Sequence, residues 1–405
     1  MLNPETIRTD FPIFAQHPDL IYLDSAATAL KPHAVIEKER EYMMDYPANI
    51  ARGLYPLATK ATQEYEQTRD TSAQWIGAKR EEIIFTKGTT ESINLLAHTL
   101  EHRIDTGDTI VVTAMDHHAN FLPWQALALR TGAHFRIVPV TEDGSLDENA
   151  FASIIDHRTK IFAFPHISNV LATVNDAPSL TQKVRALAPH ALIILDAAQS
   201  APNRTLDVTQ LGVDFVAFSA HKCFGPTGVG ILWGKYDLLD TLPPFLFGGD
   251  MVERAGEHES LFKHPPYRFE AGTSNISGII AFRSAIDYIK DLGMDEIQAH
   301  EQRLSTYAIE KLRAHFPDIH ILGSDDTQHR GGIISFILPG IHPHDLAEFL
   351  GSKDMCIRAG LHCAHPLHTS LQLSASARMS FSIYTSTQDI DRTIEAMHEA
   401  HKRYV

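Results

Sequence analysis

The chain between residues 82 and 218 contains six short apolar runs with almost no polar residues inside them. Strands that are buried on both faces of a parallel sheet have this composition, whereas strands with one solvated face alternate. Longer amphipathic stretches such as Thr90–His102 and Leu180–Leu187 separate the runs. The sequence therefore predicts an α/β domain in which helices cover a mainly parallel sheet. The candidate strands are Glu82–Thr86, Thr109–Thr113, Phe135–Val140, Lys160–Pro165, Ala191–Leu195 and Val213–Phe218.

Polar residues follow five of these runs. Ligands in open α/β sheets bind outside the carboxyl ends of the strands, so we expect these residues to form one site. Their shared placement indicates a site more strongly than any one of them does. The five segments are Thr89-Thr90, Asp116-His117-His118, His166 to Asn169, Asp196 to Gln199, and Ser219 to Lys222.

The pattern of the chain changes after residue 290. Met294–Phe316 carries Ile297, Leu304, Ala308 and Leu312 on one helical face. We predict a large domain over residues 21–290 and a smaller α+β domain over 291–405, with residues 1–20 packing on the smaller one. Its other expected elements are the strands Gly332–Leu338, Met355–Arg358 and Arg378–Tyr384, the helix Pro343–Leu350, and a last helix that begins at the capping box Ser386-Thr387-Gln388-Asp389.

Composition excludes several classes of protein. A net charge of −15 without a Lys/Arg stripe argues against nucleic-acid binding. Three cysteines in 405 residues argue against a disulfide framework and favour a reducing compartment. The N-terminus lacks the basic-then-apolar order of a secretory signal, and no apolar run approaches the length of a membrane span. We therefore expect a cytoplasmic protein that binds neither nucleic acid nor membrane.

Lys222 and Asp196 suggest the chemistry of the site. Lys222 follows a buried run and precedes the glycine-rich turn Gly225–Gly230, which is an unusual place for a solvated lysine. An amine nucleophile and an acid that can pair with a protonated ring nitrogen are what a pyridoxal-phosphate site needs. Asp196 could instead be a helix cap. Gln199, three residues later, could reach the ring's phenolic oxygen.

Two further segments allow more than one interpretation. Gly88-Thr89-Thr90-Glu91 could hold a phosphate at a helix N-terminus, or it could be a plain N-cap without a ligand. His117 and His118 are adjacent and would face opposite ways on a strand, so a shared metal ion is disfavoured. One imidazole could lie on a planar cofactor, or both could be ordinary polar residues.

The segment Arg358 to Pro366 contains a candidate nucleophile, Cys363. A thiol in a loop near positive charge can form a reactive thiolate, although an inert small hydrophobe is the alternative. A metal site built from His362, Cys363, His365 and His368 is a second alternative. We expect Cys223 and Cys356 to be packing residues. Arg378 could bind a carboxylate or form a structural ion pair.

Several motifs together resemble the class V, fold-type I pyridoxal-phosphate enzymes, and most closely the group II cysteine desulfurases of the SufS/CsdA type, which also act as selenocysteine lyases. The resemblance runs from Asp24-Ser25-Ala26-Ala27 to the last helix. The motifs that carry it are Ser219–Lys222 with Gly225–Gly228, Arg358–Gly360 with His362–Ala364, His117–Asn120 with Pro123-Trp124, His166–Val170, and Arg268–Thr273.

The resemblance implies a role for each candidate residue toward the cofactor, pyridoxal 5'-phosphate. Lys222 would hold it covalently, Asp196 would pair with its ring nitrogen, Gln199 would bind its phenolic oxygen, and His117 would stack on the ring and handle protons. The remaining cofactor contacts would come from Thr89, Thr90, Asn169, Ser219 and His221, and from Thr273 of a second subunit in a homodimer.

For the substrate, the resemblance implies that Arg378, Asn169 and Arg358 hold the carboxylate of L-cysteine. Cys363 would take the sulfur as a persulfide and leave L-alanine, supplying sulfur for uses such as iron–sulfur cluster assembly. A SufE-like protein or a scaffold would be the acceptor, and selenocysteine is a possible second substrate. The alternatives are another class V reaction, such as transamination or β-elimination with Cys363 incidental, and a metal-dependent hydrolase.

Three segments depart from the family pattern. Ala51-Arg52-Gly53 stands where relatives often have His-Arg-Gly, and Leu361 stands where a polar residue is usual. Gly248-Gly249-Asp250 varies a glycine-rich stretch. We expect these differences to bear on substrate and acceptor preference and not on the cofactor.

Overall fold

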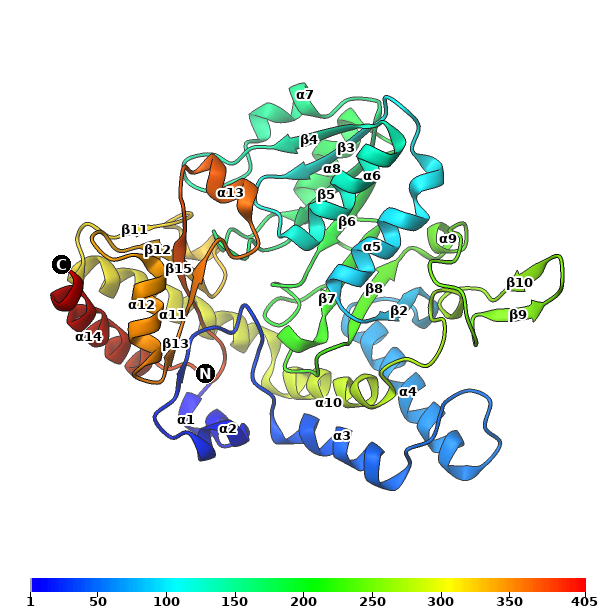
Figure 1. Ribbon diagram of the computed structural model, residues 1–405, viewed down its shortest axis with the longest axis horizontal. Coiled ribbons are helices and arrows are strands. Elements are labelled where there is room, and N and C mark those ends of the chain that lie inside the picture. Colours follow the sequence, from blue (N-terminus) through cyan, green and yellow to red (C-terminus); the bar gives the residue numbers. More distant parts are fainter. Residues whose placement is uncertain (1) are drawn as a thin grey trace.

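The computed structural model describes residues 2–405, and a seven-stranded sheet forms its centre (Figure 1). The strand order is β2-β8-β7-β6-β5-β3-β4. All neighbouring pairs are parallel except those that β8 makes with β2 and β7. The mainly parallel α/β sheet predicted from the apolar runs is confirmed. Its strands are β2 (Ile83–Thr86), β3 (Thr109–Thr113), β4 (His134–Val138), β5 (Thr159–Pro165), β6 (Leu192–Asp196), β7 (Phe215–Ser219) and β8 (Gly230–Gly234).

Helices cover both faces of this sheet, which explains why its strands are apolar throughout. Along β5, Phe162 and Phe164 belong to one core and Ile161 and Ala163 to the other. The first core is closed by α3 (His33–Asp45), α4 (Pro56–Trp75), α8 (Ala177–Leu187) and α10 (Ile276–Leu292), and the second by α5 (Thr89–Thr99) and α6 (Leu122–Thr131).

Strand β8 was not predicted, because its glycine-flanked sequence Gly-Ile-Leu-Trp-Gly continues the glycine-rich turn. It runs antiparallel between β7 and β2, so β2 still points the same way as β7. The carboxyl ends of β2, β3, β5, β6 and β7 therefore meet at one edge of the sheet. This is the placement that the sequence predicted for the polar segments.

Gly230 allows the turn before α5 to approach β8. A Cβ atom on Gly230 would lie 2.4 Å from the Cα atom of Gly88. This distance is a steric clash, and no side-chain rotation could relieve it because Gly88 contributes a backbone atom. Gly88 itself has φ +151°, a conformation that favours glycine. Two glycines thus fix where α5 begins relative to β8.

The smaller domain packs helices on a four-stranded sheet of order β11-β12-β15-β14. The capping box predicted at Ser386 is present: its side chain accepts a hydrogen bond from the amide of Asp389, and the Asp389 side chain accepts one in return. Its strands are β11 (His320–Ile321), β12 (Ile333–Ile337), β14 (Arg358–Gly360) and β15 (Ser376–Ser380), and its helices are α11 (Met294–His315), α12 (Pro343–Gly351), α13 (His365–Ser370) and α14 (Thr387–Tyr404).

Two strands predicted in this domain are wrong in extent. The expected strand Met355–Arg358 is split: β13 (Met355–Cys356) pairs with β1 (Ile21–Tyr22), whereas β14 joins the four-stranded sheet. The expected strand Arg378–Tyr384 ends at Ser380, because residues 382–385 form a turn closed by the Thr385 amide and the Ser382 carbonyl. Apolar runs do not reveal where a chain leaves one sheet for another.

The N-terminal segment lies between the two parts of the molecule (Figure 1). In α2 (Pro12–Gln16) and just before it, Phe14 and Phe11 contact Tyr384, and Phe11 also contacts Tyr288 of α10. Residues 21–23 join the core of the smaller domain through Ile21 and Leu23. Residues of the N-terminal segment thus contact the smaller domain, as expected, and also α10 of the large domain.

The remaining elements are peripheral. A hairpin of β9 (Val252–Ala255) and β10 (Ser260–Phe262) projects away from the body (Figure 1). The short helices are α1 (Pro4–Arg8), α7 (Phe151–Ile154) and α9 (Tyr236–Leu239). Within residues 2–405, none of the helices combines the length and apolar character needed to cross a bilayer.

A buried ion pair connects α4, β2 and the loop before Thr273. Arg69 donates from Nη1 and Nη2 to the two carboxylate oxygens of Glu270 at 2.7 and 2.8 Å. Glu270 also accepts the amide of Phe85 at 2.8 Å. The side chains of Arg69 and Glu270 are only 1% and 9% exposed. Water therefore cannot replace either partner when the other is removed.

We predict that Glu270→Ala lowers the free energy of unfolding by about 3 kcal/mol, because it removes the more buried of the two carboxylates that pair with the Arg69 guanidinium and leaves Glu66 as the other. The matched control is Glu101→Ala, which removes an exposed partner of Arg130 and should cost less than about 1 kcal/mol. Urea unfolding followed by circular dichroism measures both. Equal losses for the two variants would contradict this account of the buried pair.

Candidate active site

A cavity of about 260 Å³ opens at the carboxyl ends of the strands. It includes every site residue predicted from the sequence except Thr273. Residues of both domains form its wall: Ala26, Ala27, Thr89, Thr90, His117, Ala119, Pro165, Ile167, Asn169, Asp196, Ala198, Gln199, Ser219, His221, Lys222, Arg358, His362, Cys363 and Arg378.

Lys222 and Asp196 are positioned by neighbouring strands. Asp196 is the last residue of β6, and Lys222 ends the 3₁₀ turn that directly follows β7. Burial lowers the pKa of Lys222, while the nearby Asp196 carboxylate opposes this effect. Burial likewise raises the pKa of Asp196, opposed by the Ala198 amide and by Lys222. A larger fraction of the Lys222 amine is therefore neutral near pH 7 than in an exposed lysine, so Lys222 is the better candidate for a base.

The N-terminus of α5 presents hydrogen-bond donors to the same cavity. Its N-cap residue, Gly88, provides no side-chain cap. Ser219 Oγ accepts a hydrogen bond from the Thr89 amide and lies 2.8 Å from Thr89 Oγ1. Together with Thr90 and His221, these groups form a polar cradle at a helix N-terminus, the usual place for a phosphate.

His117 contributes a neutral imidazole. Burial is the main cause that lowers its pKa to about 3, with Lys222 adding to the effect. Its Nδ1 atom accepts the Ala119 amide at 3.1 Å, so the ring proton is on Nε2. At neutral pH the ring therefore adds no charge to the cavity.

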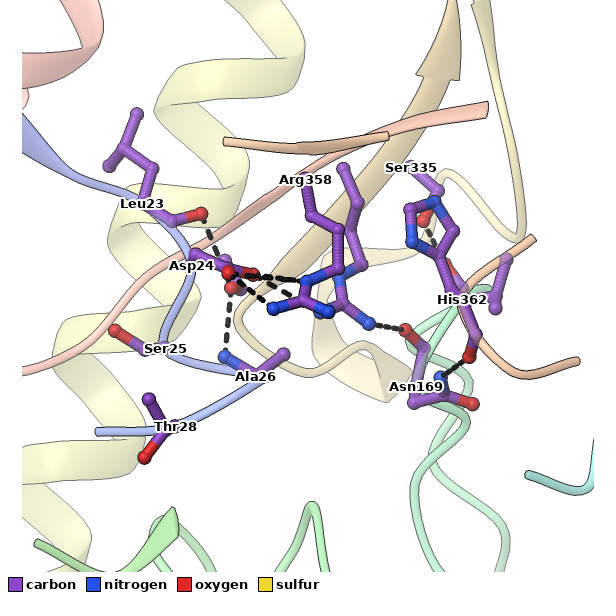
Figure 2. Close-up of polar contacts among 12 residues, drawn as sticks. Leu23, Asp24, Ser25, Ala26, Thr28, Asn169, Ser335, Arg358 and His362 are labelled. Atoms are coloured by element: carbon purple, nitrogen blue, oxygen red, sulfur yellow. Dashed lines mark hydrogen bonds and ion pairs between the residues drawn. The ribbon is translucent and has the colours of Figure 1, made fainter. Parts of the chain in front are cut away.

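Asp24 pairs with Arg358 (Figure 2) and with Arg378, and both arginines line the cavity. Arg358 donates from Nε and Nη2 to its carboxylate at 2.9 to 3.2 Å, and Arg378 donates from Nη2 at 3.3 Å. Arg378 is only 3% exposed and also donates to the Asn169 carbonyl at 3.0 Å. One carboxylate against two guanidiniums leaves a net positive charge, which suits an anionic substrate.

The loop with Cys363 is held in a strained conformation. His362 and Cys363 have φ values of 49° and 56°, in the left-handed region that non-glycine residues seldom adopt. Two hydrogen bonds hold their carbonyls: the His362 carbonyl accepts from Asn169 Nδ2, and the Cys363 carbonyl accepts from the His118 amide, each at 2.8 Å. Cys363 itself is exposed.

The residues present fit pyridoxal phosphate. The cradle at α5 matches a phosphate, the amine of Lys222 matches an aldehyde, and Asp196 is a buried carboxylate that lacks a hydrogen-bonded cation within residues 2–405. Gln199 uses one amide proton on the Ala26 carbonyl and keeps the other. Three buried atoms of the cavity-lining residues, Asn169 Oδ1, His362 Nδ1 and Arg378 Nε, have no hydrogen-bond partner in the described chain. A bound ligand would supply what they lack.

The histidines near Cys363 do not form a metal centre. No group of three His, Cys, Asp or Glu side chains among residues 2–405 has an arrangement that could hold an ion. His362 and His368 both direct Nε2 to Ser376. His118 and His365 stack on each other, with ring nitrogens 2.9 Å apart. The hydrolase alternative therefore has no ligand set in this part of the chain.

Some functional residues were not singled out from the sequence. Asp24 appeared there only as part of a motif, and its pairing with arginines more than 300 positions later leaves no local signal. Thr273 is exposed and outside the cavity of its own chain, so its role across a dimer stays a prediction. Arg52, the residue after the departure at Ala51, forms an ion pair with Asp250 at 3.0 Å, also outside this cavity.

Comparison with known proteins gives the family. Residues 21–393 match the Aminotransferase class-V family. The chain therefore belongs to this family, as its motifs predicted. Within the family it groups with the cysteine desulfurases, and the predicted cofactor, pyridoxal phosphate, is supported.

Individual relatives cover at least 98% of the chain. A probable cysteine desulfurase of Streptomyces coelicolor is 42% identical over 98% of this chain and 97% of its own length. The apo structure of cysteine desulfurase from Thermococcus onnurineus superposes with a TM-score of 0.94 at 37% identity, covering 99% of each chain. The Escherichia coli cysteine desulfurase CsdA gives a TM-score of 0.91 at 33% identity over 100% of each chain.

We predict that the purified protein carries pyridoxal phosphate on Lys222. Borohydride should bleach its visible absorption and fix the phosphopyridoxyl group to the peptide that contains Lys222, and mass spectrometry of a digest identifies that peptide. Lys222→Ala should abolish this labelling, whereas the exposed Lys87→Ala should not change it. Labelling of a different lysine in the unsubstituted protein would contradict the assignment.

Proposed function

We propose that this protein is a pyridoxal-phosphate-dependent cysteine desulfurase that transfers the sulfur of L-cysteine to Cys363 and releases L-alanine. The observation that carries the proposal is the presence of Lys222, Asp196 and Cys363 in the wall of one cavity. Full-length relatives that bear the name cysteine desulfurase support it. The cofactor, when bound, supplies an electron sink for charge that develops on the substrate's α-carbon.

Lys222 and Asp196 divide the acid–base work. Asp196, buried at the end of β6, stabilises a protonated ring nitrogen and so keeps the ring electron-withdrawing. The amine of Lys222, freed when substrate binds, removes the proton from the α-carbon. Its lowered pKa increases the fraction that is neutral near pH 7, which is the form a general base needs.

The two arginines and Asn169 receive the substrate. Arg378 is held by Asp24 and by the Asn169 carbonyl, so its guanidinium is already oriented for a carboxylate. Arg358 is half-exposed and its charge is largely balanced by Asp24. We therefore assign the main carboxylate contact to Arg378 and a supporting one to Arg358.

Cys363 is the acceptor of the sulfur. Its thiolate forms a bond with the substrate's sulfur while the bond from that sulfur to the β-carbon breaks. The electron pair remains with the carbon, which takes a proton and becomes the methyl group of alanine. The positive charges of Lys222, Arg358 and Arg378 are close enough to interact with the thiolate.

The wider biological setting follows from the same proposal. The exposed Thr273 loop would complete the site of a partner in a homodimer, as the family resemblance implies. The persulfide would pass to a SufE-like protein or a scaffold, for instance for iron–sulfur cluster assembly, and selenocysteine would be a second substrate. We propose a cytoplasmic location, in keeping with three free cysteines.

We predict that Cys363→Ala retains the coloured cofactor and loses sulfur release from L-cysteine by at least about a hundredfold, because no thiolate remains to attack the sulfur. Sulfide release in the presence of a reductant is the measurement. Cys356→Ala, which removes a cysteine of β13, should keep most of the activity. Unchanged release by the Cys363 variant would favour a different class V reaction with this cysteine incidental.

We predict that Arg378→Lys raises the KM for L-cysteine about tenfold, because lysine keeps the charge but loses the planar fork that binds a carboxylate. Steady-state kinetics at several cysteine concentrations separates KM from kcat. Arg358→Lys is the control, and its KM should change less. A larger effect at position 358 than at position 378 would reverse the assignment of the main contact.

A further inference from the structure

A second, much smaller cavity lies behind Lys222. Its volume is about 30 Å³, which is enough for a single water molecule. Four residues line both this space and the larger cavity: Ala26, Ile167, Gln199 and Lys222. The smaller cavity therefore continues from Lys222 toward the small domain.

Glu301 of α11 is part of the wall of this small cavity. The residue is only 4% exposed, and its Oε2 atom has no hydrogen-bond partner among residues 2–405. Gly332 makes room for it, since a Cβ atom there would lie 2.8 Å from Oε2. A buried, unpartnered carboxylate oxygen beside a water-sized space is costly unless it has a ligand or a proton.

The charged and titratable groups around Glu301 come from three segments. Arg204, which follows β6, favours the carboxylate, as do the Asn203 side chain and the Gly332 amide. Tyr384, from the turn after β15, is a neutral neighbour whose pKa burial raises to about 12. Burial outweighs Arg204 and raises the pKa of Glu301 to about 7. Lys222 is part of the wall of the same cavity.

We propose that Glu301 exchanges a proton with Lys222 through water in this cavity and so sets the protonation state of the lysine amine from the side opposite the substrate. In one direction the proton leaves the Lys222 ammonium, crosses the water and neutralises the Glu301 carboxylate, and in the other it returns. No other group is oxidised or reduced. The inference rests on the proposed function, because it gives a route for the proton that Lys222 handles.

Glu301 acts through Lys222 and does not touch the reacting atoms, so it is a positioning residue. Asp196 is a poor candidate for the same task, because its carboxylate is needed on the cofactor ring. Substrate would occupy the larger cavity, whereas Glu301 lines only the smaller one. Of the carboxyl groups that line the two cavities, Asp196 and Glu301, only Glu301 is therefore free to equilibrate with the amine during turnover.

The test compares holoenzyme of Glu301→Gln with that of Glu310→Gln, the same change at an exposed position of the same helix. The Glu301 carboxylate is the proton acceptor, so activity of the unsubstituted enzyme should rise with pH through about 7. We expect kcat of Glu301→Gln to lose this rise with pH and to be about tenfold lower than that of the unsubstituted enzyme at neutral pH. Glu310→Gln should keep the profile of the unsubstituted enzyme.

Infrared difference spectra give a readout that does not depend on activity. Titration of the apoprotein and of the holoenzyme across neutral pH should show a carboxyl carbonyl band that disappears as pH rises and that is missing in Glu301→Gln. If this variant does not fold, the titration of the unsubstituted protein decides alone: absence of the band overturns the proposal.

The failures of the two proposals can be distinguished. Normal sulfur release with an unchanged pH profile in Glu301→Gln overturns the proton route and leaves the desulfurase in place. A coloured, folded, unsubstituted protein that releases no sulfur from cysteine overturns both. If Glu301→Gln loses both the rise of kcat with pH and the infrared band, the route through Glu301 is supported.

Discussion

The whole site depends on a buried amine and a buried carboxylate at the ends of two adjacent strands. Lys222 follows β7 and Asp196 ends β6, and each is desolvated by the helices that cover the sheet. An isolated charge in such a place is expensive, so both groups shift toward their neutral forms. A ligand with a basic nitrogen and a carbonyl relieves both penalties at once. The fold therefore holds the cofactor's partners in an environment that suits the cofactor.

The second part of the chemistry comes from the smaller domain, and Asp24 connects the two. Leu23 and Asp24 run beside β15, where the Ser380 amide donates to the Leu23 carbonyl. From there Asp24 reaches Arg358 of β14 and Arg378 of β15. The strained loop that follows β14 then brings Cys363 to the cavity in which Lys222 lies. Acid–base groups belong to the large sheet, and the carboxylate contact and the thiol belong to the small one.

Much of this arrangement could be predicted from the sequence, because the relevant signals are local. Continuous apolar runs gave the strands of the large sheet, and the residue after each run gave its carboxyl end. Long-range pairings gave no such signal. Asp24 bonds to residues far along the chain, β13 and β14 divide between sheets at Ile357, and Glu301 looks like any acid on an amphipathic helix until Gly332 and its cavity are seen. Strand β8 was missed because its flanking glycines resemble a turn.

The central claim is that the sulfur of free cysteine moves to Cys363 in a cavity built around Lys222 and Asp196. The most direct measurement is mass spectrometry of the peptide that contains Cys363 after one turnover with cysteine labelled by a heavy sulfur isotope, without reductant. We predict a single labelled sulfur on Cys363 and one equivalent of unlabelled alanine. Labelled sulfur on Cys223 or Cys356, or alanine formed without any sulfur on the protein, would contradict the account.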